Sequence, residues 1–149
     1  MGMYTGLRFK GIIKEEFAEL IRKLMYEGLT WHDLSACYPQ YDFLHAFSEI
    51  PRADFIPCGV LSYMPTSWEA DSLDSFDRRF NQDSRLWTFQ CSLKNYNEEI
   101  EKFFQIIVPE IVEKSIHIEY YYEEMTRSVF YELKDGKVVE SDREGIFYN

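Results

Sequence analysis

The sequence predicts an α+β protein in which an antiparallel sheet is covered by helices. Polar and apolar residues alternate over 86–93 and again over 115–123, which is typical of strands with one buried face. The segment 98–111 between them carries an apolar stripe at helical spacing. The dipeptide Asp135-Gly136 is the strongest short signal for a two-residue hairpin, because a type I′ turn needs positive φ at both central positions. These observations favour one sheet with a C-terminal hairpin.

The N-terminal residues predict a strand followed by a helix. The strand is expected over Met3–Ile13, and Gly2, Gly6 and Gly11 indicate bulges or a close backbone approach. The helix is expected over 14–27, and Gly28 lies where a left-handed residue commonly ends a helix.

Four segments follow before the strand at 86–93. The first two are expected to be helices, and the pair Thr30 and Asp33 favours the start of the first. An apolar run between prolines then predicts an edge strand, and a polar stretch predicts a surface excursion with a short helix near 75–80. The four segments are Trp31–Cys37, Tyr41–Ser48, Phe55–Tyr63 and Thr66–Ser84.

The second strand–helix unit resembles the first in pattern. Residues 9–14 and 89–94 place their apolar residues and a closing lysine alike, and similar apolar pairs follow in each helix. Asn95 and Glu98 predict a capping box for the second helix, and Pro109 predicts a kink or restart within it. Two strand–helix–strand units favour a ferredoxin-like sheet with both helices on one face. Residues 29–54 would then be a helical insertion, and the C-terminal hairpin would extend the sheet.

The last third of the chain resembles a known small domain. Residues 118–124, Ile-Glu-Tyr-Tyr-Tyr-Glu-Glu, and 130–136, Phe-Tyr-Glu-Leu-Lys-Asp-Gly, are similar to a ferredoxin-like domain of plasmid- and phage-borne bacterial proteins of unknown function. In that family a strand with closely spaced tryptophans comes first, whereas Trp87 stands alone here. The resemblance implies the fold and a mobile-element or defence-related context, and it implies no active site.

Length and charge limit the classes of function. A chain of 149 residues predicts a single domain spanning 1–149. The formal net charge of −10 disfavours direct nucleic-acid binding, which needs a basic surface, and permits a basic protein partner. No run predicts a membrane span, so we expect no membrane partner and a cytoplasmic location. Three cysteines without CxxC spacing fit reduced thiols, and no cofactor motif is present.

The candidate binding residues are acidic side chains and one tryptophan. Acidic residues in the last third would form a face for a basic partner, and Trp68, in the polar excursion, has no evident core role. His117 lies near some of these acids, which suggests a metal or acid–base site, but a solvated outer face is the interpretation we favour. No residue is predicted to bind a metal. The binding candidates are Glu119, Glu123, Glu124, Glu132 and Trp68.

Two alternatives to a binding protein remain open at this point. His32, Cys37 and His45 are candidate catalytic residues of a small-molecule-binding or hydrolytic enzyme with a pocket at the helical insertion. A homo-oligomer paired through sheet edges is the other alternative. The residues favour a non-enzymatic, protein-binding module of the immunity or anti-defence type, because no coherent catalytic set accompanies the acidic and aromatic residues.

Overall fold

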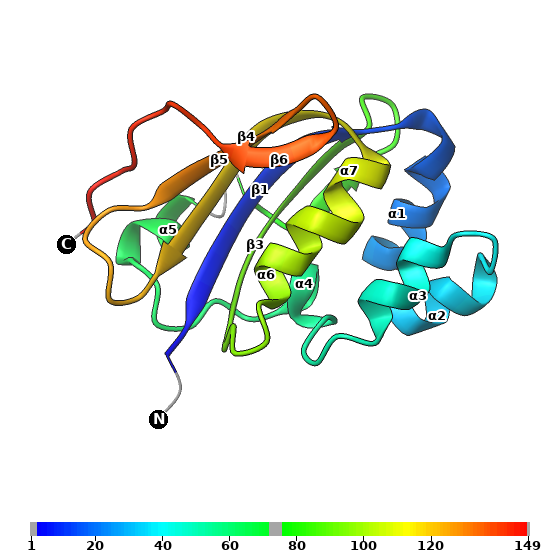
Figure 1. The fold of residues 1–149 in the computed structure, drawn as a ribbon, viewed down its shortest axis with the longest axis horizontal. Coiled ribbons are helices and arrows are strands. Elements are labelled where there is room, and N and C mark those ends of the chain that lie inside the picture. Colours follow the sequence, from blue (N-terminus) through cyan, green and yellow to red (C-terminus); the bar gives the residue numbers. More distant parts are fainter. Residues whose placement is uncertain (1–2, 72–75, 149) are drawn as a thin grey trace.

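The centre of the molecule is a six-stranded antiparallel sheet with the order β2-β3-β1-β4-β5-β6 (Figure 1). The computed structural model describes residues 3–71 and 76–148. The predicted α+β class is confirmed, whereas the ferredoxin-like arrangement stays a prediction. The strands are β1 (Thr5–Ile13), β2 (Arg79–Asn81), β3 (Leu86–Leu93), β4 (Val112–Tyr122), β5 (Val129–Lys134) and β6 (Lys137–Glu140).

Strand β1 lies between β3 and β4 and sets the register of the sheet. Thr5 is opposite both Leu93 and Tyr122, so the start of β1 meets the ends of β3 and β4 at one end of the sheet. Gly11 lies at a register shift against β4, and a Cβ on Gly6 would approach the Trp68 ring to 2.7 Å. The predicted bulge is confirmed at Gly11, whereas at Gly6 the close neighbours are side chains and not backbone. Gly2 lies outside the described residues.

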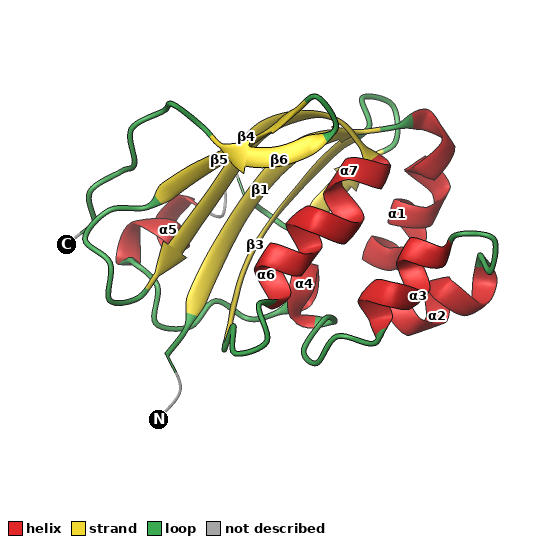
Figure 2. Cartoon of the chain, in the orientation of Figure 1, coloured by secondary structure: helices red, strands yellow, loops and turns green. Residues whose placement is uncertain are grey.

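Most helices pack on one face of the sheet and form the main core with it (Figure 2). Alternation places Leu7, Phe9 and Phe89 on this face, where Phe103 meets both phenylalanine rings at 6.1 Å between centroids. The helices are η1 (Glu15–Phe17), α1 (Ala18–Tyr26), α2 (Trp31–Cys37), α3 (Asp42–Ser48), α4 (Phe55–Cys58), α5 (Thr66–Asp71), α6 (Glu99–Lys102), the π-helical η2 (Phe103–Ile107) and α7 (Val108–Ile111).

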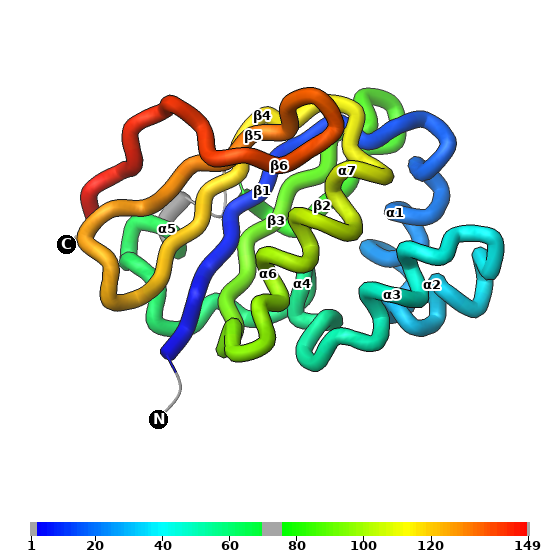
Figure 3. Tube along the Cα trace, viewed as in Figure 1, coloured from blue at the N-terminus to red at the C-terminus, as the bar shows by residue number. Residues whose placement is uncertain are grey.

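The opposite face of the sheet is also covered. Trp68 of α5 packs against Gly6 of β1, and its ring lies 6.1 Å from that of Tyr121 in β4. The C-terminal segment 141–148 returns beside the start of β5, where the Ser128 amide donates to the Ile146 carbonyl at 2.9 Å (Figure 3). This second layer places polar side chains of β1 and β4 in the protein interior.

Several local predictions are confirmed. The Thr30–Asp33 pair forms a reciprocal capping box at the start of α2. The β5–β6 turn is a two-residue loop in which Asp135 and Gly136 have φ values of 54° and 76°. Pro109 lacks the N–H that an α-helix needs there, and the turn of π-helix that precedes α7 is the predicted interruption.

Three local predictions are wrong. Residues 55–63 contain the short helix α4 and irregular chain in place of the predicted strand. One edge of the sheet is instead β2, within the segment expected to be a surface excursion. The helix expected near 75–80 is absent over 76–80, and residue 75 lies outside the described residues. Asn95 accepts from the Ile100 amide, but Glu98 is left-handed with φ 58° and forms no capping box.

No helix among the described residues is long and apolar enough to cross a membrane.

Candidate binding surface

Two of the predicted binding residues are buried. Glu119 and Trp68 have no exposed surface, so neither can contact a partner directly, and the prediction that they do is wrong. The reason is the second layer on the sheet: the face of β4 that was interpreted as solvated lies beneath α5 and the C-terminal segment. The Trp68 ring contacts Tyr148 of that segment at 6.0 Å and the Arg8 guanidinium at 4.6 Å.

Glu119 is held as a buried carboxylate by three hydrogen-bond donors. Its oxygens are 2.9 Å from Nε2 of His117 and 2.7 Å from the Tyr148 hydroxyl, and Ser128 is the third partner. Burial alone raises the pKa of the carboxyl, but these bonds outweigh it and lower the pKa below its ordinary value. Burial and the bond to Glu119 raise the pKa of Tyr148, which therefore donates as a neutral phenol.

The remaining predicted acids do not form one face. Glu123 and Glu124 follow β4, where Glu123 accepts from the Tyr4 amide and Glu124 is exposed. Glu132 is half-buried on β5, opposite Val139 of β6. The structure therefore places Glu123 and Glu124 at the end of the sheet where β1 begins, and Glu132 elsewhere.

The three candidate catalytic residues do not interact with one another. His32, Cys37 and His45 are exposed, and His45 lies 3.2 Å from Glu49 in its own helix turn. Within the described ranges no hydrogen bond connects any two of the three. No group of three His, Cys, Asp or Glu side chains in those ranges is placed to hold a metal.

A cavity lined by tyrosines lies at the end of the sheet where β1 begins. Its volume is about 420 Å³, and Tyr120 and Tyr122 of β4 form one wall. Tyr96, from the loop between β3 and α6, lines it as well and is 57% exposed. The strand pairs of Thr5 with Leu93 and Tyr122 explain this meeting of distant segments.

Acidic groups accompany these rings. Glu98 and Glu101 line the cavity, and Glu101 accepts from Asn95 Nδ2 at 2.7 Å. Burial and the nearby Glu101 charge raise the pKa of Tyr120. The exposed carboxylate of Glu98 and that of Glu124, which interacts with Tyr122, place negative charge at the rim of the cavity.

Further aromatic and apolar side chains lie at the same end of the sheet, outside the cavity. Tyr63 is 72% exposed and its ring lies 5.0 Å from that of Tyr4, while nearby Val60 is also exposed. The Arg52 guanidinium lies 5.4 Å from the Tyr96 ring and the Lys94 ammonium 6.0 Å from the Tyr4 ring. We call this region the tyrosine surface. It comprises Tyr4, Tyr63, Tyr96, Tyr120, Tyr122, Glu98, Glu101 and Glu124.

The backbone of the tyrosine surface is unusual. Tyr63 and Glu98, together with the adjacent Arg52, have φ values near 60°, a conformation that residues with a Cβ adopt at an energetic cost. Such conformations persist where surrounding structure enforces them, and they concentrate at functional sites. In the described ranges two other non-glycine residues share this conformation, and one of them, Asp135, lies in the hairpin turn.

Sequence reasoning missed most of this surface. The tyrosine-rich run at 120–122 was the available signal, but the cavity also needs residues 95–101 and Met3, which lie far away in the chain. Only the pairing of β1 with both β3 and β4 brings these segments together.

No family model, curated protein or solved structure matches this chain.

Proposed function

We propose that the protein is a non-enzymatic binding module that docks a basic protein partner through the tyrosine surface. The observation that carries the proposal is the tyrosine-lined cavity with acidic side chains at its wall and rim, which lies at the same end of the sheet as the exposed Tyr63 ring. In its narrower form the proposal is an immunity or anti-defence protein, which the family resemblance of the last third supports.

The chemistry of the surface fits cationic side chains. Tyrosine faces attract lysine and arginine cations, and adjacent carboxylates add charge pairing. Two such contacts exist within the chain, since the Arg52 guanidinium lies near the Tyr96 ring and the Lys94 ammonium near the Tyr4 ring. A net charge of −10 would accelerate the encounter with a basic partner at low salt.

Tyrosine is also suited to a protein interface. Its ring offers a large contact area with few rotatable bonds, and aromatic anchors contribute much of the binding energy in many interfaces. Tyr63 and Tyr96 are exposed rings and Glu98 is an exposed acid, so the tyrosine surface combines accessible rings with negative charge.

The proposal is tested by affinity capture from an extract of the source cells with a pair of charge-reversed variants. Glu98→Lys with Glu124→Lys changes exposed acids of the tyrosine surface, so the fold should persist while capture of a basic partner is lost. The matched control is Glu15→Lys with Glu16→Lys, two exposed acids that follow the other end of β1. Equal capture by both variants and the wild type would contradict the proposal.

We also infer that the central four strands have the ferredoxin-like arrangement. The order β2-β3-β1-β4 supports this, because β3 and β4 run in the same direction, are joined through α6 to α7, and have β1 between them. The packing of α1 and the α6–α7 segment into one core supports it too. Strands β5 and β6 are then the added hairpin, and α2 and α3 belong to the insertion.

A further inference from the structure

A second cavity opens where β4 and β5 diverge. Lys10 of β1 is opposite His117 and Gly11 is opposite Ser115, so Ile116 is an extra, bulged residue whose side chain is 52% exposed. Strand β5 pairs with β4 only over residues 118–120. Beyond that ladder the Leu133 amide donates instead to Ser115 Oγ at 2.9 Å. The resulting cavity has a volume of about 420 Å³, which is in the range of small-molecule sites.

His117 lines this cavity, and its imidazole is held in place by two aromatic rings and a carboxylate. The ring lies between Phe76, at 4.8 Å, and Phe130, at 5.1 Å, and its Nε2 is 2.9 Å from a Glu119 oxygen. An ionised carboxylate can only accept a hydrogen bond, so Nε2 carries the hydrogen. Nδ1 is then the ring nitrogen left for a ligand, and no described residue bonds to it.

Glu119 is a fully buried carboxylate, and removing a charge from water is costly unless other groups compensate it. Glu119 has compensation from His117, Tyr148 and Ser128. In enzymes and binding sites a buried carboxylate behind an imidazole fixes its tautomer and orientation. Bulges are frequent beside such sites because they redirect neighbouring side chains.

The lining of this cavity is less acidic than the protein as a whole. Lys114 and Arg143 line it, and within the described part of the chain neither forms an ion pair with an acidic side chain. The Arg143 guanidinium is held 3.9 Å from the Phe130 ring. Of the two acids that line the cavity, Glu113 is paired with Arg85 at 3.3 Å, which leaves Glu132. The lining therefore holds two cations and two acids, and one of the acids is already paired with a cation outside the cavity.

We propose that this cavity, lined by His117, Lys114 and Arg143, is a binding site for a small molecule that carries an oxyanion, a phosphate or a carboxylate. Arg143 and Lys114 supply the charge for the oxyanion, and Nδ1 of the imidazole, held by Glu119, accepts a hydrogen bond from a hydroxyl group of the same ligand. The exposed Ile116 side chain gives an apolar edge to the same cavity. This site is separate from the tyrosine surface and does not depend on the protein partner.

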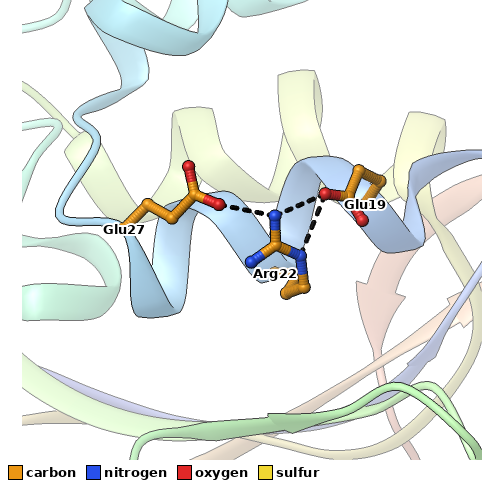
Figure 4. Close-up of polar contacts among 3 residues, drawn as sticks. All are labelled: Glu19, Arg22 and Glu27. Atoms are coloured by element: carbon orange, nitrogen blue, oxygen red, sulfur yellow. Dashed lines mark hydrogen bonds and ion pairs between the residues drawn. The ribbon is translucent and has the colours of Figure 1, made fainter.

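The test is an NMR titration of the full ¹⁵N-labelled chain with inorganic phosphate and, separately, with acetate, at ionic strength held constant with chloride. The two probes distinguish a phosphate from a carboxylate ligand. Arg143→Gln removes one cation, and because Arg143 is exposed the fold should be retained. The matched control is Arg22→Gln on α1, whose guanidinium binds Glu19 and Glu27 outside the cavity (Figure 4).

The expected result is a saturable shift of the amides at 114–117 and 131–133 with at least one anion, in the wild type and in Arg22→Gln. The affinity of Arg143→Gln should fall about tenfold, as expected for the loss of one charged hydrogen bond. Absence of a saturable shift with both anions would overturn the proposal, and so would equal affinities of Arg143→Gln and the wild type.

Discussion

Replacement of Glu119 by glutamine is the sharpest perturbation of the buried polar layer. The change preserves shape but removes the charge that His117, Ser128 and Tyr148 compensate. Glutamine keeps one acceptor oxygen and turns an NH₂ group toward side chains that donate. At least one of the three donors therefore loses its acceptor in the protein interior.

The magnitude follows from the number of bonds. A hydrogen bond to a charged group contributes about 1.5–3 kcal/mol, so we expect Glu119→Gln to lower the free energy of unfolding by about 2–4 kcal/mol. Urea denaturation near neutral pH measures this, and the m-value should be unchanged because the fold is the same. The matched control is Glu124→Gln, an exposed acid near the end of β4, which should stay within about 0.5 kcal/mol of the wild type.

The same pair of proteins gives a pH dependence with a defined sign. The pKa of Glu119 is lowered in the folded protein, so its charge stabilises the fold fully above the unfolded pKa of about 4.3 and loses this effect as pH falls through the folded pKa. The difference between wild type and Glu119→Gln should therefore shrink in acid. Arg8, opposite Glu119 in β1, with His117 and Tyr148, are the other titratable groups that face it. If Glu119→Gln were as stable as the wild type at neutral pH, or if the difference in their free energies of unfolding grew in acid, the reasoning would be refuted.

Two further predictions concern buried side chains. Trp68→Ala should lower the free energy of unfolding by about 3–5 kcal/mol, because it leaves a cavity in the protein interior. Tyr63→Ala, at a highly exposed ring, should change it by less than about 1 kcal/mol. Equal effects of the two substitutions in urea denaturation would contradict the buried position of Trp68. Burial raises the pKa of Cys91, so a thiol reagent should label the exposed Cys37 and Cys58 in the native protein and Cys91 only after unfolding; rapid labelling of all three would contradict the fold.

The residues on the helix-covered face of the sheet could be predicted from the sequence, because the patterns that indicate them involve residues close together in the chain. Alternation in β3 places Trp87, Phe89 and Cys91 in the core as predicted, and the capping pair Thr30 and Asp33 marks the start of α2. Such signals depend on residues close together in the chain, so single-sequence patterns report them.

Burial of the other face could not be predicted from the sequence, because the segments that cover it are distant in the chain. His117 and Glu119 alternate with apolar residues, as the polar side of an exposed strand would. Nothing near them in sequence indicates that Trp68 and Tyr148 close over them. The tyrosine surface was missed for the same reason, since it exists only once β1 pairs with β3 and β4.

The most direct test of the docking proposal is site-specific photo-crosslinking in the source cells. A benzoylphenylalanine placed at Tyr63 would report contacts of the tyrosine surface, and one placed at Tyr26, an exposed tyrosine on α1 beside β2, is the matched control. We predict a salt-sensitive adduct with a basic protein from position 63 and none from position 26. Adducts of equal yield from both positions, or from position 26 alone, would contradict the proposal that the tyrosine surface is the docking face.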